Sequence, residues 1–170
     1  MFQDEEKRLF LLAGVSILLY KLFDPVKLNI VARIGSMEEF TDLPNKINNN
    51  SKVIVELGYP SLFEIKTIAE LYNIDVSGFI HTVDNYAVRH ALNRHSKDTL
   101  PISKDDLPLI PFITLYPDSI SKGKDKNTNS KRVVYKKKFN NIIHAIEYVL
   151  EIRTGKKNLA MVTMYKKPTK

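Results

Sequence analysis

The apolar positions of this chain follow a helical spacing at its start and a strand spacing at its end. Residues 4–23 form an amphipathic to strongly apolar run that predicts a helix, and Asp24-Pro25 ends it. The β-branched residues in 26–34 predict a strand. Ser36 and Glu39 then have the spacing of a capping box, which predicts a short acidic helix.

A change of pattern near residue 60 predicts a division of the chain. The polar stretch 44–51 is the best linker candidate, and 52–57 predicts a short strand or an apolar turn. The break Gly58-Tyr59-Pro60 follows. We therefore expect a small N-terminal region of unknown role over 1–60 and a separate domain over 61–170.

Two further helix starts are marked in the second half. Ser61 and Glu64 form another capping box, and Asn73 ends the helix that follows. Apolar residues at helical spacing support this helix, namely Leu62, Ile65, Ile68, Ala69 and Tyr72. The next helix begins at Thr82 or at Asp84, either of which can cap it.

Prolines and polar residues then interrupt the pattern. Ser103 caps a predicted short helix over 104–109, and Pro111 is expected to end that helix. Residues 121–131 contain no apolar side chain and have the composition of a basic, mobile loop.

Alternation predicts three antiparallel strands at the end of the chain, 132–138, 142–153 and 159–166, with a tight hairpin at 154–158. The middle strand has an apolar face made of His144, Ile146, Tyr148, Leu150 and Ile152. Its other face consists of Glu147, Val149, Glu151 and Arg153. We expect the first face to cover the core and the second to be open to a substrate.

The length of the hairpin loop decides which residues share that open face. A five-residue loop pairs Arg153 with Leu159 and places Thr163 and Tyr165 on the face of Glu151. A four-residue loop turns Thr163 and Tyr165 to the core, because a slip of one residue reverses every side chain. The register stays open at this point, but the whole pattern predicts an α+β fold, with N-terminal helices before a C-terminal antiparallel sheet.

Charge is distributed unevenly along the 170 residues. Residues 1–85 carry 8 Lys and Arg against 12 Asp and Glu, a net charge of −4, whereas 86–170 carry 18 against 7, a net charge of +11. A strongly basic half indicates a polyanionic partner such as nucleic acid. The alternative is a lysine-rich solvated surface.

Several chemistries lack their residues in this sequence. There is no Cys, which excludes disulfides, thiolate metal sites and a Cys nucleophile. No HExxH or clustered carboxylate motif is present, and the six Gly form no phosphate-binding loop. We therefore expect neither a metal nor a cofactor.

The run Leu9–Tyr20 is the one segment apolar enough to suggest a membrane. It has 12 residues, whereas a transmembrane helix needs about 20, and acidic rather than basic residues precede it. It therefore predicts a buried helix rather than a stable membrane span, and an interfacial or entry role stays open. The lack of Cys fits a protein that acts in the cytoplasm, including one delivered there across a membrane.

Candidate acid–base groups gather on the helix that carries His90 and His95. Histidine titrates near neutral pH and can accept or donate a proton. Residues five apart lie about 140° apart around a helix, so His90 and His95 can face one phosphate only if the helix ends between them. A His that caps the helix C-terminus is the alternative. His81, just before the helix, is a weaker candidate.

The second half also carries a set of short motifs, namely Val76–His81, Asp84–His90, His95, Ile102–Leu107, Pro117-Asp118, Glu151–Ala160 and Thr163–Lys166. Together they resemble the phage-associated branch of the barnase–EndoU–colicin–RelE (BECR) superfamily of metal-independent ribonucleases. The resemblance covers residues 61–170 and implies a BECR-type ribonuclease domain.

The resemblance also implies roles for four strand residues. Glu151 and Arg153 would act as base and phosphate clamp, although they could equally form an ion pair across an exposed face. The hydroxyls of Thr163 and Tyr165 would bind the scissile phosphate or orient the base, unless these residues are present only for their β propensity. The basic residues expected to contact RNA phosphates are Arg89, Arg94, Lys156, Lys157, Lys166 and Lys167.

These patterns together predict a metal-independent endoribonuclease that cleaves by transesterification to a cyclic phosphate, such as a toxin acting on tRNA or another structured RNA. An acidic immunity protein would be the matching partner. The alternatives are a catalytically silent nucleic-acid-binding module and a phage structural accessory protein on the same fold.

Overall fold

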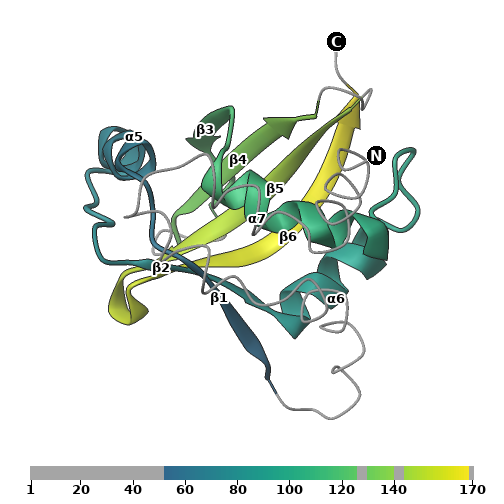
Figure 1. The fold of residues 1–170 in the computed structure, drawn as a ribbon, viewed down its shortest axis with the longest axis horizontal. Helices are drawn as coiled ribbons and strands as arrows, with labels where there is room; N and C mark the ends of the chain where they lie inside the picture. Colours follow the sequence, from purple (N-terminus) through teal and green to yellow (C-terminus); the bar gives the residue numbers. More distant parts are fainter. Residues whose placement is uncertain (1–51, 126–129, 140–143, 169–170) are drawn as a thin grey trace, which may run out of the picture.

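The computed structural model describes residues 52–125, 130–139 and 144–168, and Figure 1 shows their arrangement. The helix expected over 4–23, the strand over 26–34 and the capping box at Ser36 lie outside these residues. The N-terminal helices of the expected fold therefore receive no support from the structure.

The described part is a mixed α/β fold built on one six-stranded sheet. The strands are β1 (Ile54–Gly58), β2 (Ile80–Asp84), β3 (Ser119–Lys122), β4 (Arg132–Lys138), β5 (His144–Arg153) and β6 (Asn158–Pro168). Their order in the sheet is β1-β2-β6-β5-β4-β3. The antiparallel arrangement of the last three strands is confirmed, but the parallel pairing of β2 with β6 makes the whole sheet mixed.

Strand β1 extends the sheet to the N-terminal side of residue 61. It pairs with β2 in antiparallel fashion, from Ile54 opposite Asp84 to Gly58 opposite His81. The sheet thus includes residues on both sides of the division expected at residue 60, and that division stays a proposal.

Three α-helices and two short 3-10 helices connect the strands, namely α5 (Leu62–Tyr72), α6 (Asn85–Arg94), α7 (Ile110–Leu115), η2 (Lys104–Leu109) and η3 (Thr154–Lys156). The predicted capping box opens α5, where the Ser61 N–H donates to Glu64 at 2.6 Å. Asn73 ends α5 in the left-handed conformation, with φ of 54°. Of the two candidate caps for α6, Asp84 is the one used, since its carboxylate accepts from the Ala87 N–H at 2.8 Å.

The expectation that Pro111 ends a helix is wrong. Ser103 does precede a helical segment, η2, and its N–H donates to Asp106 at 2.7 Å. The chain then continues directly into α7, in which Pro111 stands in the first turn. A proline fits there because the first turn of a helix has no partner for a backbone N–H. The loop expected over 121–131 is also shorter, because Ser121 and Lys122 belong to β3.

One face of the sheet forms the core with the helices. The apolar face expected on β5 is buried at Ile146, Tyr148, Leu150 and Ile152. Helix residues join the same cluster, including Ile68 of α5, Val88 and Ala91 of α6 and Ile110 and Ile113 of α7. Figure 1 shows α7 in front of β4 and β5, and α6 beside β6. The other face of β5, expected to be open, is turned away from this helical layer but is open only in part: Glu147 and Val149 on it are buried, and Glu151 and Arg153 are half-buried.

A β-bulge in β6 decides which side chains lie on that other face. Arg153 pairs with Asn158, so the hairpin loop has four residues, the case in which Thr163 and Tyr165 were expected to turn to the core. That expectation is wrong, because the register shifts between Val149 and Leu150. Val149 pairs with Thr163 and Leu150 with Met161, so Val162 is the extra residue of the bulge. It returns Thr163 and Tyr165 to the face of the two glutamates.

Candidate active site

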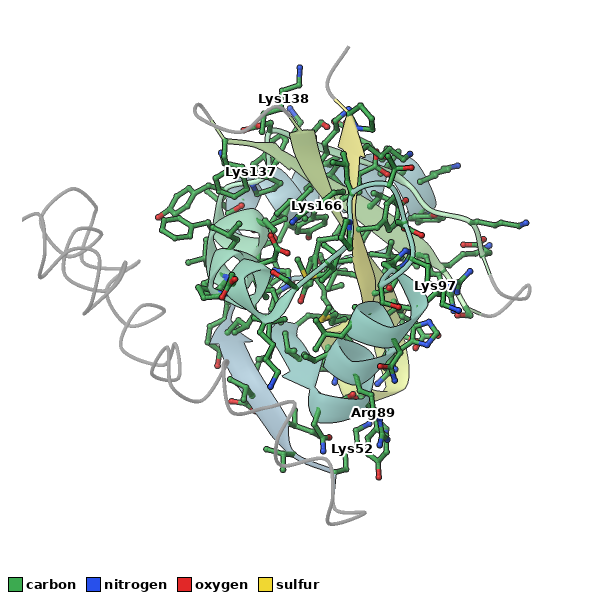
Figure 2. All side chains as sticks on the ribbon, turned by 90° about the vertical axis from the view of Figure 1, so that its right-hand side faces the viewer. Lys52, Arg89, Lys97, Lys137, Lys138 and Lys166 are labelled. Atoms are coloured by element: carbon green, nitrogen blue, oxygen red, sulfur yellow. The ribbon has the colours of Figure 1, made fainter. Side chains whose placement is uncertain are left out.

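Strand β6 is longer than its parallel neighbour β2, and this difference creates the site. Their pairing ends at Thr82 opposite Ala160, although β6 continues to Pro168. Beyond Ala160, helix α6 packs along this side of β6. Figure 2 views this side of the molecule, with Arg89 on α6, Lys97 just after α6 and Lys166 on β6 labelled. The end of α6 is thus brought next to the open face of the sheet.

His95 is the residue that links α6 to that face. Helix α6 ends at Arg94, and His95 follows as its C-cap. The His95 ring lies against the Tyr165 ring, with centroids 5.4 Å apart and planes tilted by 32°. Its Nδ1 is 2.7 Å from a carboxylate oxygen of Asp98, and an ionised carboxylate can only accept, so we assign the proton to Nδ1. The other nitrogen, Nε2, is buried and has no hydrogen-bond partner among the described residues.

Thr163 and Tyr165 lie two residues apart on the same face of β6, about 7 Å from each other along the strand. The Tyr165 hydroxyl donates to Glu147 at 2.7 Å, and burial together with this carboxylate raises the pKa of Tyr165 well above its ordinary value. Lys167 forms an ion pair with the same carboxylate at 3.0 Å. The Thr163 hydroxyl is buried and has no partner among the described residues. Tyr165 therefore has an unpaired imidazole nitrogen on the ring beside it and an unpaired hydroxyl two residues away on the same face of β6.

His90 lies one helical turn before His95. Its pKa is lowered, first by partial burial and then by the positive charge of Arg94 and the proximity of His95. Helix α6 ends at Arg94, but the His95 N–H still donates to the Ala91 carbonyl as it would in a helix, so the end of α6 does not by itself turn both rings to one phosphate.

Glu151 and Arg153 lie elsewhere on the same open face. Glu151 is four residues from Glu147 along β5, about 13 Å toward the hairpin. It accepts hydrogen bonds from the Ser130 hydroxyl and from Arg153 Nε, the latter at 2.6 Å. Burial opposes its ionisation, but these two donors and the charge of Arg132 outweigh burial and lower the pKa of Glu151. The ion pair thus runs along one strand rather than across two.

The basic residues expected to contact RNA fall into three groups. Lys156 and Lys157 are exposed at the β5–β6 hairpin, at the opposite end of β6 from Tyr165. Arg89 and Arg94 lie on α6, with Arg94 next to His95, and Lys167 lies two residues after Tyr165 on β6. Lys166 points to the helical side, where it forms a largely buried ion pair with Asp106 at 2.8 Å. That geometry favours a structural role for Lys166 over a phosphate contact.

His81 is placed in the core rather than in the site. It is fully buried in β2, and its Nε2 is 2.7 Å from a carboxylate oxygen of Glu64. Its ring also meets the edge of Tyr135, with centroids 5.9 Å apart.

Sequence reasoning gave no role to two residues of the site. Glu147 was placed on the open face without a function, because its neighbour Tyr165 depends on the bulge at Val162. Asp98 lies outside every motif, although a carboxylate three residues after a C-terminal histidine could have suggested the contact. Both residues are recognised only from their contacts with Tyr165 and His95.

The described residues contain neither a candidate metal site nor a candidate membrane-spanning helix. No group of three or more His, Asp or Glu there is arranged to hold a metal ion. Within the same ranges, no helix has the length and hydropathy needed to span a membrane.

The structure thus has a sheet with one face covered by helices, a second, partly exposed face that carries acid–base groups, and a helix whose C-cap contacts Tyr165 on that face. This arrangement fits the nuclease family to which the sequence belongs. The chain belongs to the phage-Barnase-EndoU-ColicinE5/D-RelE like nuclease 3 family, whose model matches residues 61–170. This confirms the resemblance seen in the motifs and identifies a nuclease-family domain. No curated protein and no solved structure matches the chain.

Proposed function

We propose that this domain is a metal-independent endoribonuclease whose reaction centre lies where α6 meets the open face of β6. One observation carries the proposal: His95 Nε2, whose ring lies against Tyr165, and the hydroxyl of Thr163, two residues from Tyr165 on the same face of β6, are both buried without a hydrogen-bond partner among the described residues. Buried polar atoms in proteins are nearly always paired, so two unpaired ones at one place are typical of a site that awaits a ligand.

The chemistry assigns a proton-transfer role to each histidine. His90 has a lowered pKa and is therefore neutral near pH 7, so it can take the proton of a ribose 2′-hydroxyl. The 2′-oxygen then attacks phosphorus and the bond to the 5′-oxygen breaks. Protonated His95 donates its Nε2 proton to that leaving oxygen. The products are a 2′,3′-cyclic phosphate and a free 5′-hydroxyl.

The remaining groups of the centre bind and position. The Thr163 hydroxyl can donate to a non-bridging phosphate oxygen, and Lys167, which is paired with Glu147 and lies four residues farther along β6, supplies positive charge at the Tyr165 end. Tyr165 holds the His95 ring, and Glu147 holds the Tyr165 hydroxyl. Val149 is the strand partner of Thr163, so Glu151 lies about 7 Å and Arg153 about 13 Å farther along β5, where they would contact the nucleotide next to the scissile phosphate.

Cleavage of total RNA and purified tRNA in EDTA tests the proposal. We expect discrete fragments that end in cyclic phosphate from the wild-type chain, and loss of about 10²–10⁴ in rate for His90→Ala and His95→Ala. Thr163→Ala should also lower the rate. Asn93→Ala is the matched control, because Asn93 is exposed on the same helix. Wild-type activity in both histidine variants would refute the assignment of this centre.

Two substitutions of Tyr165 distinguish the contribution of its ring from the contribution of its hydroxyl. Tyr165→Phe keeps the ring against His95 but removes the donor to Glu147, whereas Tyr165→Ala removes both. We expect Tyr165→Ala to lower kcat far more than Tyr165→Phe, with a shifted pH–rate profile. Equal losses would assign the effect to the hydroxyl alone.

The finer parts of the proposal concern the substrate and the partner. The excess positive charge of 86–170 supports a structured RNA such as tRNA as substrate, and an acidic immunity protein as the inhibitor of a toxin. A wild-type chain that binds RNA but cleaves none would instead favour the silent binding module. Copurification with virion proteins, again without cleavage, would favour the structural accessory protein.

A further inference from the structure

Arg132, the first residue of β4, is a cation on the open face that the reaction centre does not use. It pairs with Glu151 in the register of β4 and β5, so the two side chains lie on the same face of the sheet. Arg132 is half-buried, and its Nε is buried without a hydrogen-bond partner among the described residues. Buried polar atoms are nearly always paired, so an unpaired guanidinium nitrogen indicates a site for a ligand.

The backbone of Arg132 is held by three contacts. Its N–H donates to a carboxylate oxygen of Asp125 at 3.1 Å, and its carbonyl accepts from the Tyr72 hydroxyl at 2.6 Å and from the Gly123 N–H at 2.7 Å. A Cβ at position 123 would come within 3.0 Å of the Arg132 carbonyl oxygen, so glycine lets the chain after β3 approach β4 this closely. These contacts fix the start of the Arg132 side chain, which lowers the entropy lost when a ligand orders it.

The carboxylates near Arg132 have other cations as partners. Asp125 forms an ion pair with Lys131 at 3.1 Å, and Glu151 accepts from Arg153 Nε at 2.6 Å. Within residues 52–125, 130–139 and 144–168, Arg132 has no ion-pair partner. Three cations and two carboxylates leave this group with a net charge of +1, and Arg132 is the cation available to an anion.

The position of Arg132 relative to Arg153 and Thr163 suits a strand that runs across the sheet. Arg132 and Arg153 are diagonal neighbours on the open face, and their Cβ atoms lie within about 8 Å, a separation that two long side chains can span. From Thr163, Arg132 is displaced by about 7 Å along the strands and by about 10 Å across them. An anion held by both arginines is therefore a neighbour of the scissile phosphate rather than that phosphate itself.

We propose that Arg132 and Arg153 together bind a backbone phosphate of the RNA strand beside the cleaved bond, with Glu151 orienting Arg153. The planar fork of a guanidinium binds phosphate oxygens in pairs, and such charge-assisted bonds are strong. The inference rests on the proposed function, because the bound phosphate belongs to the strand that the reaction centre cleaves. It adds Arg132 to the residues that position this strand.

Binding of a non-cleavable strand tests this phosphate subsite without relying on catalysis. The probe is a short, fluorescein-labelled single-stranded 2′-O-methyl RNA, in which no attacking hydroxyl is left. Its linkages are replaced one at a time by neutral methylphosphonate, and fluorescence anisotropy gives the Kd of each strand. We expect one linkage whose replacement weakens binding to the wild-type chain by about tenfold or more but leaves binding to Arg132→Gln unchanged.

Two further variants separate a specific contact from a general loss of charge. Lys66→Gln is the matched control, because Lys66 is exposed on α5 and its replacement changes the net charge by the same amount. It should change the Kd of every strand by one common factor. Arg132→Lys keeps the charge but not the planar fork, so it should restore only part of the lost affinity. Circular dichroism of each variant shows whether the domain still folds.

The outcomes distinguish this inference from the proposed function. Equal effects of Arg132→Gln and Lys66→Gln at every linkage would overturn the subsite, as would the absence of any wild-type binding to the probe. One linkage whose charge matters only when Arg132 is present would support the phosphate site, even if unmodified RNA is not cleaved. Cleavage of unmodified RNA by the Arg132→Gln chain at the wild-type rate and KM would leave the reaction centre in place and remove the subsite.

Discussion

The buried pair of Glu64 and His81 offers the sharpest test of how this domain is held together. Both side chains are 1% exposed, and Glu64 lies 2.7 Å from His81 Nε2. The other carboxylate oxygen accepts from the Ser61 N–H at 2.6 Å, so one residue both caps α5 and joins it to β2. Removal of the Glu64 carboxylate should therefore detach α5 from the sheet and also leave the polar ring of His81 in the core.

The expected cost follows from these contacts. Glu64→Gln keeps the shape and one acceptor but removes the charge, which should lower the free energy of unfolding by about 1.5–3 kcal/mol. Glu64→Ala removes both hydrogen bonds and leaves His81 unpaired, which should cost about 3–5 kcal/mol. Small domains are stable by only about 5–15 kcal/mol, so either change should be plain in a urea titration.

The pH dependence of the same pair has a definite sign. Burial opposes ionisation of Glu64, but the charge and hydrogen bond of His81, with the donors of Ser61, outweigh burial and lower its pKa. A lowered carboxyl pKa stabilises the fold above the ordinary value of 4.5, and that contribution is lost as the pH falls through the lowered pKa. The difference in stability between wild type and Glu64→Gln should therefore narrow below about pH 4.5.

Urea unfolding at a series of pH values from about 3 to about 8 measures both the loss of stability in the Glu64 variants and its dependence on pH. Glu70→Gln is the matched control, because Glu70 is exposed on the same helix. A difference between Glu64→Gln and wild type that stays constant with pH, or that equals the Glu70→Gln effect, would refute the reasoning.

Three other predictions concern α6, β6 and the hairpin. Arg94→Gln should raise the pKa of His90 toward its ordinary value, and an NMR titration that finds it unchanged would remove Arg94 as a cause. Lys166→Met should destabilise the fold by about 1–3 kcal/mol, because it leaves Asp106 with a buried, unpaired charge, and a thermal melt equal to that of the wild type would contradict this. Lys157→Gly should raise the melting temperature slightly, since Lys157 has φ of 47°, and a lower value would show that the side chain itself matters there.

The sequence predicted the local elements whose signals lie within a few residues of each other. The capping box of Ser61 and Glu64, the end of α5 at Asn73 and the three C-terminal strands were all correct. These features depend on contacts between near neighbours, which a pattern of residue types records directly. Strands β2 and β3 were missed, because β2 is a short buried segment and β3 is a short polar edge with little apolar alternation.

The proposed reaction centre depends on two features of the tertiary structure. The bulge at Val162 places Thr163 and Tyr165 beside Glu147, and the excess length of β6 over β2 lets the end of α6 reach Tyr165. The alternation of residue types in β6 does not reveal the extra residue of a bulge, because the packing of the strand segments on both sides of the bulge decides where it forms. The chain alone therefore determined which side chains could do acid–base chemistry, whereas only the folded sheet decided that His95 and Glu147 meet at Tyr165 and that Thr163 shares the face of Glu147.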